Sequence, residues 1–290
     1  MGAFGRSWEI TKLSFKVIKQ DKELILFPIL SGFFSLIFIL GLLFPTILIV
    51  LIRGESVVLG AIEYLVFFVI YFGLAFIATF FNVCTVYTVK KRFEGGNSKP
   101  SEAIKFAFSR IYLIFLWSLL AATVGLILRI IEQTAERVKG IGGLIIHYVN
   151  SLLGLMWSII TIFVVPSMVY KNLGPIDAIK NSVAVLKKTW GESLIRYIGL
   201  GLAELLFIVL GVIGFIILFI VGLSIGPFGI LIVLIMAIIY FLGVILIFGI
   251  ANSVFNTALY VYAETGKVPG EYNETVIKNA FKPKGSKTII

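Results

Sequence analysis

The sequence predicts an all-α integral membrane protein, and this prediction rests on the amount of charge and on its distribution. Of the 290 residues, 59% are hydrophobic and only 14% are charged, whereas soluble domains carry roughly 25% charged residues. The charged residues also gather in short clusters, with long uncharged segments between them. A soluble enzyme, a disordered chain and a disulfide scaffold are therefore excluded as classes.

Six segments are long and apolar enough to cross a bilayer as helices, which takes about 20 residues each. The last uncharged run, from Leu205 to Ala263, would be more than twice the bilayer thickness as one helix at about 1.5 Å per residue. It must therefore turn back, and the glycines and the proline between Ser224 and Gly229 suit a tight turn. The expected spans are Leu24–Ile52, Tyr64–Val89, Ile111–Leu128, Gly140–Tyr170, Tyr197–Leu223 and Ile230–Tyr260.

The basic residues predict the orientation of these spans. With six spans, 21 of the Lys and Arg side chains fall on the side that carries both termini, and 4 fall on the other side. Basic residues collect on the cytoplasmic side of membrane proteins, so we expect a multi-pass protein of the cell membrane with both termini in the cytoplasm. The formal net charge of +10 then indicates attraction to anionic lipid headgroups, and not a nucleic-acid partner.

A short segment before each odd-numbered span follows one pattern. Ser or Pro comes first, an acid follows two residues later, and a Lys three after the acid, as in Ser7–Lys12, Pro100–Lys105 and Pro175–Lys180. These residues favour helix starts, and the segments that follow are amphipathic, which is typical of helices in the headgroup plane. Alternatively, helix starts converge on such residues without any repetition. The lysines expected to contact headgroups are Lys12, Lys16, Lys105, Lys180, Lys187 and Lys188.

The fold class predicted is therefore six transmembrane helices in three hairpins, each hairpin preceded by a cytoplasmic amphipathic helix. The chain is expected to be a single membrane domain with repeat units at about 7–92, 93–173 and 174–262, and residues 263–290 form a cytoplasmic tail. The three units share one orientation, so any pseudo-symmetry axis would run along the membrane normal.

The N-terminal sequence Arg6-Ser-Trp-Glu-Ile-Thr-Lys12, followed by Asp21-Lys-Glu-Leu-Ile-Leu-Phe-Pro-Ile-Leu-Ser-Gly32, resembles the start of an uncharacterised prokaryotic family of six-span membrane proteins. That family is loosely similar to the membrane domains of some glycerophosphodiester phosphodiesterases. The resemblance implies a prokaryotic source and a six-span fold. It implies no phosphodiesterase activity, because no catalytic domain is present.

Glu204 is the acid that the basic segments do not explain, because it lies within the fifth expected span. Ionisable groups inside a bilayer are costly and are candidates for function. Asn82, Asn252 and Asn256 lie at similar depth on spans two and six. The four could form a polar pocket, or hydrogen bonds that only tie the helices together.

Two further ionisable residues, Glu63 and His147, are expected near the outer face, where contact with water or packing is the simpler interpretation. One histidine without partners makes no metal site, and neither a catalytic motif nor a cofactor motif is evident. We therefore expect a non-enzymatic protein that interacts with lipid or organises the membrane. The alternative is a small-solute transporter or channel with its polar site around Glu204.

Overall fold

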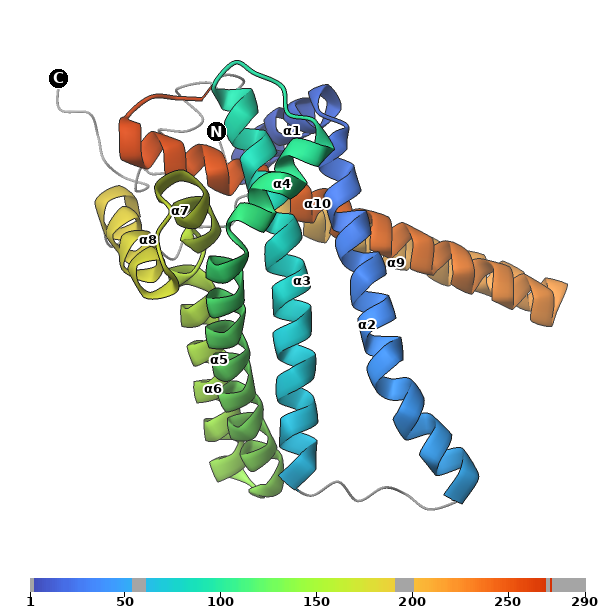
Figure 1. The fold of residues 1–290 in the computed structure, drawn as a ribbon. Helices are drawn as coiled ribbons and strands as arrows, with labels where there is room; N and C mark the ends of the chain where they lie inside the picture. The colour runs from blue at the N-terminus through green and yellow to red at the C-terminus, as the bar shows by residue number, and fades with distance from the viewer. Residues whose placement is uncertain (1–2, 54–60, 191–200, 270–271, 273–290) are drawn as a thin grey trace. The chain divides into compact units, whose positions relative to one another are not determined.

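The computed structural model describes residues 3–53, 61–190, 201–269 and 272, and in these residues the chain is helical (Figure 1). All regular structure that is described is α-helix, in ten segments. They are α1 (Ala3–Gln20), α2 (Glu23–Arg53), α3 (Ala61–Phe93), α4 (Pro100–Ser109), α5 (Ile111–Arg137), α6 (Ile141–Ile160), α7 (Val164–Lys171), α8 (Pro175–Trp190), α9 (Gly201–Ile225) and α10 (Pro227–Thr265).

The prediction of six membrane-length segments is confirmed for the described residues. The segments Glu23–Phe44, Tyr64–Phe93, Ile111–Arg137, Ile141–Lys171, Ala203–Ile225 and Pro227–Thr265 are long and apolar enough to cross a membrane. The third is longer than predicted, because its helix continues to Arg137 through residues that carry charge. The predicted start of the fifth, at Tyr197, lies outside the described residues.

The chain divides into two compact units, each assembled from separate stretches of sequence. Unit 1 contains residues 1–26, 92–97 and 187–290, and unit 2 contains residues 27–91 and 98–186. This division cuts across the repeat units predicted from the sequence, which stay a prediction. The two units are described separately below.

Aromatic pairs hold the long helices of unit 2 side by side. Phe34 of α2 stacks on Phe81 of α3, with 5.9 Å between the ring centroids. Phe72 of α3 meets Phe115 of α5 edge to face at 5.3 Å. Trp117 of α5 stacks on a tryptophan of α6 at 5.8 Å. Such pairs contribute about 0.5–1.5 kcal/mol each beyond the area they bury.

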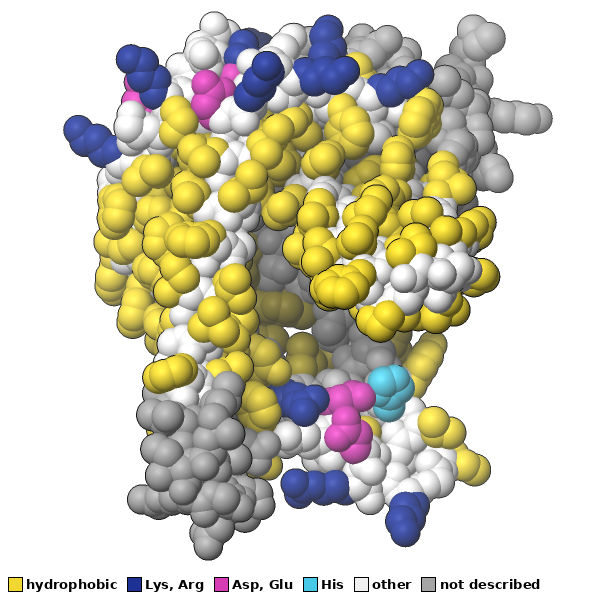
Figure 2. All heavy atoms as spheres, turned by 90° about the vertical axis from the view of Figure 1, so that its right-hand side faces the viewer, with side chains coloured by type: hydrophobic (Ala, Val, Ile, Leu, Met, Phe, Trp, Pro, Cys, Tyr) yellow, Lys and Arg dark blue, Asp and Glu magenta, His cyan; other side chains and the backbone are white. Residues whose placement is uncertain are grey.

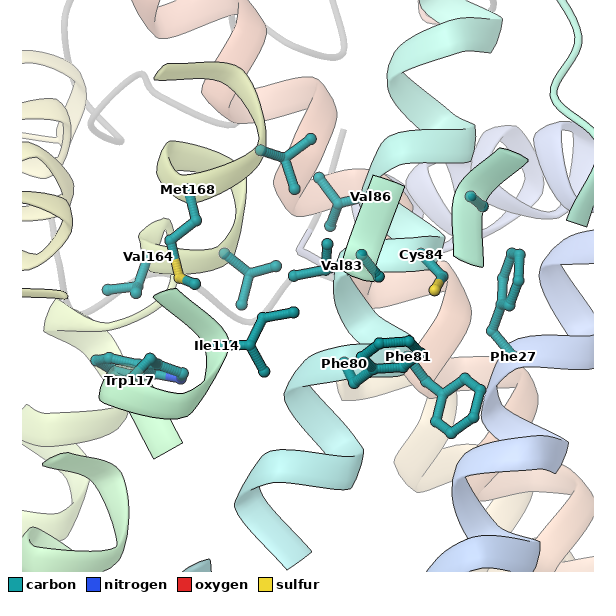
Figure 3. Packing of buried hydrophobic residues seen from close by; sticks show 14 of the residues in the cluster. Phe27, Phe80, Phe81, Val83, Cys84, Val86, Ile114, Trp117, Val164 and Met168 are labelled. Carbon is teal, nitrogen blue, oxygen red and sulfur yellow. The ribbon is translucent and has the colours of Figure 1, made fainter. Parts of the chain in front are cut away.

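The core of unit 2 lies where the end of α3 meets α4, α5 and α7. Figure 3 shows Val83 and Val86 of α3 on the side of Ile114 of α5 and Met168 of α7, and Cys84 on the side of Phe27 of α2; all six are buried. Much of the remaining apolar surface of the long helices is exposed, and hydrophobic side chains cover much of the face shown in Figure 2. This pattern is that of helices whose outer surface meets lipid.

The fourth predicted span, Gly140–Tyr170, is confirmed as a membrane-length segment, and the structure shows that it consists of two helices. Helix α6 ends at Ile160 and α7 begins at Val164, with a turn between them. Proline causes this break, because Pro166 has no N–H and its ring clashes with the carbonyl four residues earlier. The backbone N–H of Phe163 instead donates to Ser182 Oγ of α8, at 3.2 Å.

In unit 1, helices α9 and α10 pack closely beside the turn that joins them. Gly226 links them with φ 90°, a conformation that suits glycine, so the predicted reversal lies where the sequence placed it. A Cβ atom at Gly229 would lie 2.6 Å from the carbonyl oxygen of Gly222. Further along, the Tyr240 hydroxyl donates to the carbonyl of Phe207 at 2.9 Å.

Helix α1 packs against α9 and α10 within unit 1. It buries Thr11, Ser14, Val17 and Ile18 on one face, and Phe15 meets Phe248 of α10 at 5.6 Å. The helix begins at Ala3, so the expectation that Ser7 starts it is wrong. The apolar face that was expected to enter the lipid headgroups is partly covered by protein.

A buried ion pair fixes the junction of α1 and α2 to the end of α3. The Asp21 side chain is 1% exposed and accepts both hydrogen bonds of the Arg92 fork, from Nε at 2.5 Å and from Nη2. Bidentate pairs of this kind combine charge with a defined geometry. Nearby, Tyr272 is buried against Phe93 and Phe255 and shares a 2.8 Å hydrogen bond with Ser14.

We predict that Asp21→Asn lowers the free energy of unfolding by about 3 kcal/mol, because it removes the charge of the buried carboxylate from a bidentate ion pair. The Arg92 side chain is 26% exposed, so the loss should fall at the low end of the range for buried pairs. Thermal unfolding in detergent measures it. Asp177→Asn is the matched control, since its 3.4 Å pair with Lys180 is solvent-exposed and should be worth less than about 1 kcal/mol. Equal losses in the two variants would contradict the prediction.

Candidate functional site

The structure divides the four residues of the predicted polar pocket between the two units. Glu204, Asn252 and Asn256 belong to unit 1, whereas Asn82 belongs to unit 2. Glu204 lies in the first turn of α9 as described and is half-buried. Its carboxylate makes neither a hydrogen bond nor an ion pair with another described residue. Asn252 is exposed, while Asn256 and Asn82 are half-buried. The pocket therefore stays a prediction.

The predicted outer-face histidine has a partner that sequence reasoning missed. His147 Nδ1 of α6 lies 2.5 Å from Glu132 Oε1 of α5, and Asn150 Nδ2 donates to Glu132 Oε2 at 2.8 Å. The histidine, the only one in the chain, is visible beside acidic side chains in Figure 2. The spacing of three between His147 and Asn150 places both on one helix face, which is the signal that was available. The side chain of Glu63 lies outside the described residues.

The lysines predicted to contact headgroups are exposed wherever they are described. Lys12 and Lys16 lie on α1, Lys105 on α4, and Lys180 and Lys187 on α8. The side chain of Lys188 is outside the described residues. Exposure leaves these ammonium groups accessible to anions from outside the protein.

A small buried residue follows the lysine at the same distance in α1, α4 and α8, which are called the three short helices below. Two positions after Lys12, Lys105 and Lys180 come Ser14, Ala107 and Ser182, and each of these three is 0% exposed. Ser14 meets Tyr272, and Ser182 accepts the N–H of Phe163. At this position each helix therefore approaches its neighbours closely, and the lysine is held on the exposed side.

Unit 2 also contains a cluster of cations on aromatic rings that the sequence analysis did not identify. The rings of Tyr87 in α3 and Phe106 in α4 are stacked at 4.3 Å. Lys91 Nζ lies 5.9 Å from the Tyr87 ring centroid, and Arg110 Cζ lies 5.1 Å from that of Phe106. In both pairs the cation follows its ring by four residues, which is helical neighbour spacing. That spacing is readable in the sequence, but the stacking of the two rings is not.

In the part of the chain that the structure describes, the fold is that of an all-helical protein of the membrane type. A model of a family of unknown function, DUF6159, matches residues 61–270. The chain therefore belongs to the DUF6159 family. No curated protein and no solved structure matches it. The N-terminal residues behind the resemblance described above lie outside the matched range, and the likeness to phosphodiesterase membrane domains stays a prediction.

We predict that Glu132→Gln and His147→Gln each lower the melting temperature, because each disrupts the contact between α5 and α6. Since the two groups act through one interaction, the double variant should melt no lower than the more damaged single variant. Thermal unfolding in detergent at constant pH provides the comparison. Glu136→Gln, at an exposed position on the same helix, should leave the melting temperature unchanged. Strictly additive losses in the double variant would show that the two side chains act independently.

Proposed function

We propose that this protein is a non-enzymatic membrane protein that binds anionic lipids at the cytoplasmic face and so organises the surrounding bilayer. One observation carries the proposal. Each of the three short helices presents an exposed lysine beside an exposed large apolar side chain. The pairs are Lys12 with Trp8, Lys105 with Phe108, and Lys180 with Ile176, and these apolar residues are 38%, 59% and 61% exposed.

This pairing suits the boundary between water and lipid. An ammonium group gains from anionic headgroups, at about 1 kcal/mol for each Lys near the surface. An apolar side chain gains by entering the upper acyl region. In α1 the two are held together, since Lys12 Nζ lies 5.8 Å from the Trp8 ring centroid. A helix that faced only water would gain no stability from exposing this large apolar side chain.

The proposed topology agrees with this role. If both termini are cytoplasmic, the three short helices and 21 of the 25 basic residues lie on the side of the anionic leaflet. The three hairpins, each preceded by its surface helix, then form three repeats of one unit. The buried small residue at the equivalent position of each helix supports this repetition. The sequence contains no motif that suggests an enzyme. We therefore propose that the protein acts by binding lipid.

The test compares two charge-matched double variants in vesicles of phosphatidylglycerol and phosphatidylcholine. Lys105→Gln/Lys180→Gln removes two exposed charges from the short helices. Arg137→Gln/Lys139→Gln removes two exposed charges at the far end of α5 and just beyond it. We expect the first to lower the enrichment of phosphatidylglycerol around the protein, measured with spin-labelled lipids, and the second to leave it unchanged. Equal enrichment of both lipids around the wild-type protein would refute the proposal.

Transport is the second candidate function, and the position of Glu204 favours it. A half-buried carboxylate that makes no hydrogen bond or ion pair with another described residue is available to bind a proton or a small cation. In vesicles that contain a pH-sensitive dye, a transporter would carry protons under an applied potential, and Glu204→Gln would abolish this flux. Glu102→Gln, at an exposed position of α4, is the control. Absence of flux through the wild-type protein would exclude proton transport.

A further inference from the structure

The cation–aromatic cluster of unit 2, made of Tyr87, Lys91, Phe106 and Arg110, is built on a rigid base. The two stacked rings lie within 18° of parallel, and both are partly buried against the hydrophobic core of the unit. Each cation is held by a ring one helical turn away. The side chains are therefore preorganised, so a ligand would not have to fix long flexible chains before it binds.

The two cations of the cluster have unused hydrogen-bonding capacity. Neither Lys91 nor Arg110 makes an ion pair with a described carboxylate, and Arg110 Nε is buried without a hydrogen-bond partner. A contact with a ring face compensates part of the positive charge, but it does not use the N–H donors that lie in the guanidinium plane. A phosphate oxygen is the acceptor that best matches this planar fork.

The position of the cluster indicates where such a phosphate would come from. Arg110 immediately precedes the membrane-length helix α5, and Lys91 lies two residues before the end of α3. Phosphates of lipid headgroups lie at this level of a membrane protein. Directly after Arg110, α5 presents an exposed apolar stripe of Ile111, Tyr112, Phe115 and Leu119. A free phosphate ion would make no use of this stripe, whereas an acyl chain would cover it.

We infer that this cluster binds one anionic phospholipid, whose phosphate is held by Arg110 while Lys91 supplies a second positive charge. One acyl chain of the lipid lies along the exposed stripe of α5. This inference rests on the proposed lipid-binding function and names the site of tightest binding. The stacked rings position the two cations and exclude water from one side of the headgroup.

Native mass spectrometry of the full-length protein in detergent, with palmitoyl-oleoyl phosphatidylglycerol added, tests the site. We expect the wild-type protein to retain one lipid more tightly than the others. Arg110→Gln should weaken that retention about tenfold, which corresponds to one charge-assisted hydrogen bond, and Lys91→Gln should weaken it less. Arg110→Lys should give an intermediate result, because it keeps the charge but loses the fork. The Arg137→Gln/Lys139→Gln control should bind as the wild type does.

The possible outcomes distinguish a failure of this binding site from a failure of the proposed lipid-binding function. If Arg110→Gln retains the lipid as the wild type does, the site is wrong, and a loss of enrichment in Lys105→Gln/Lys180→Gln would still support the proposed function. In a second experiment, phosphatidylcholine and glycerol 3-phosphate compete with phosphatidylglycerol for binding to the wild-type protein. This experiment does not depend on the folding of a variant. Equal competition by phosphatidylcholine would show that the negative charge is not recognised. Equal competition by glycerol 3-phosphate would show that the ligand is a free phosphate ester and would overturn the lipid assignment.

Discussion

The structure depends on one constraint, which is that a bilayer core offers no hydrogen-bond partner to a backbone N–H or C=O group. The long, continuously apolar segments of this chain satisfy these groups through helices, which supply all their own backbone bonds. Once six long segments are helical, their polar side chains have to lie near the helix ends or meet one another. The pair of Asp21 with Arg92 and the contacts of Glu132 both follow this rule.

The same constraint explains why the sequence predicted the long helices well. Length and continuous hydrophobicity are local properties, and so the six membrane-length segments and the reversal at Gly226 could be located without a structure. The break before Pro166 was harder to place, because proline is common in spans and a break depends on whether neighbours satisfy the backbone groups that it leaves open. Here Ser182, which lies 19 residues beyond Phe163, is one such neighbour.

The candidate sites were harder to predict, because they depend on which helices meet. Glu132 was not singled out, since nothing in the sequence shows that α6 brings His147 and Asn150 to it. Arg92 was counted as one more basic residue of the cytoplasmic side, although it pairs with a buried aspartate 71 positions away. The stacking of Tyr87 on Phe106 also depends on which helices meet, so the sequence does not predict it. The exposed lysines were predictable, because exposure follows from the amphipathic pattern alone.

The break in the fourth span makes two segments with different surroundings out of one apolar run. Helix α6 has 20 residues and so measures about 30 Å at about 1.5 Å per residue, which is enough to cross the hydrocarbon core by itself. In α7 every residue from Val164 to Val169 is buried within the protein. Bilayers differ in thickness, and a span adapts to this mainly by tilting. With a joint at residues 161–163, α6 can change its tilt while α7 keeps its packing. The packing of α7 therefore does not depend on the thickness of the membrane around the protein.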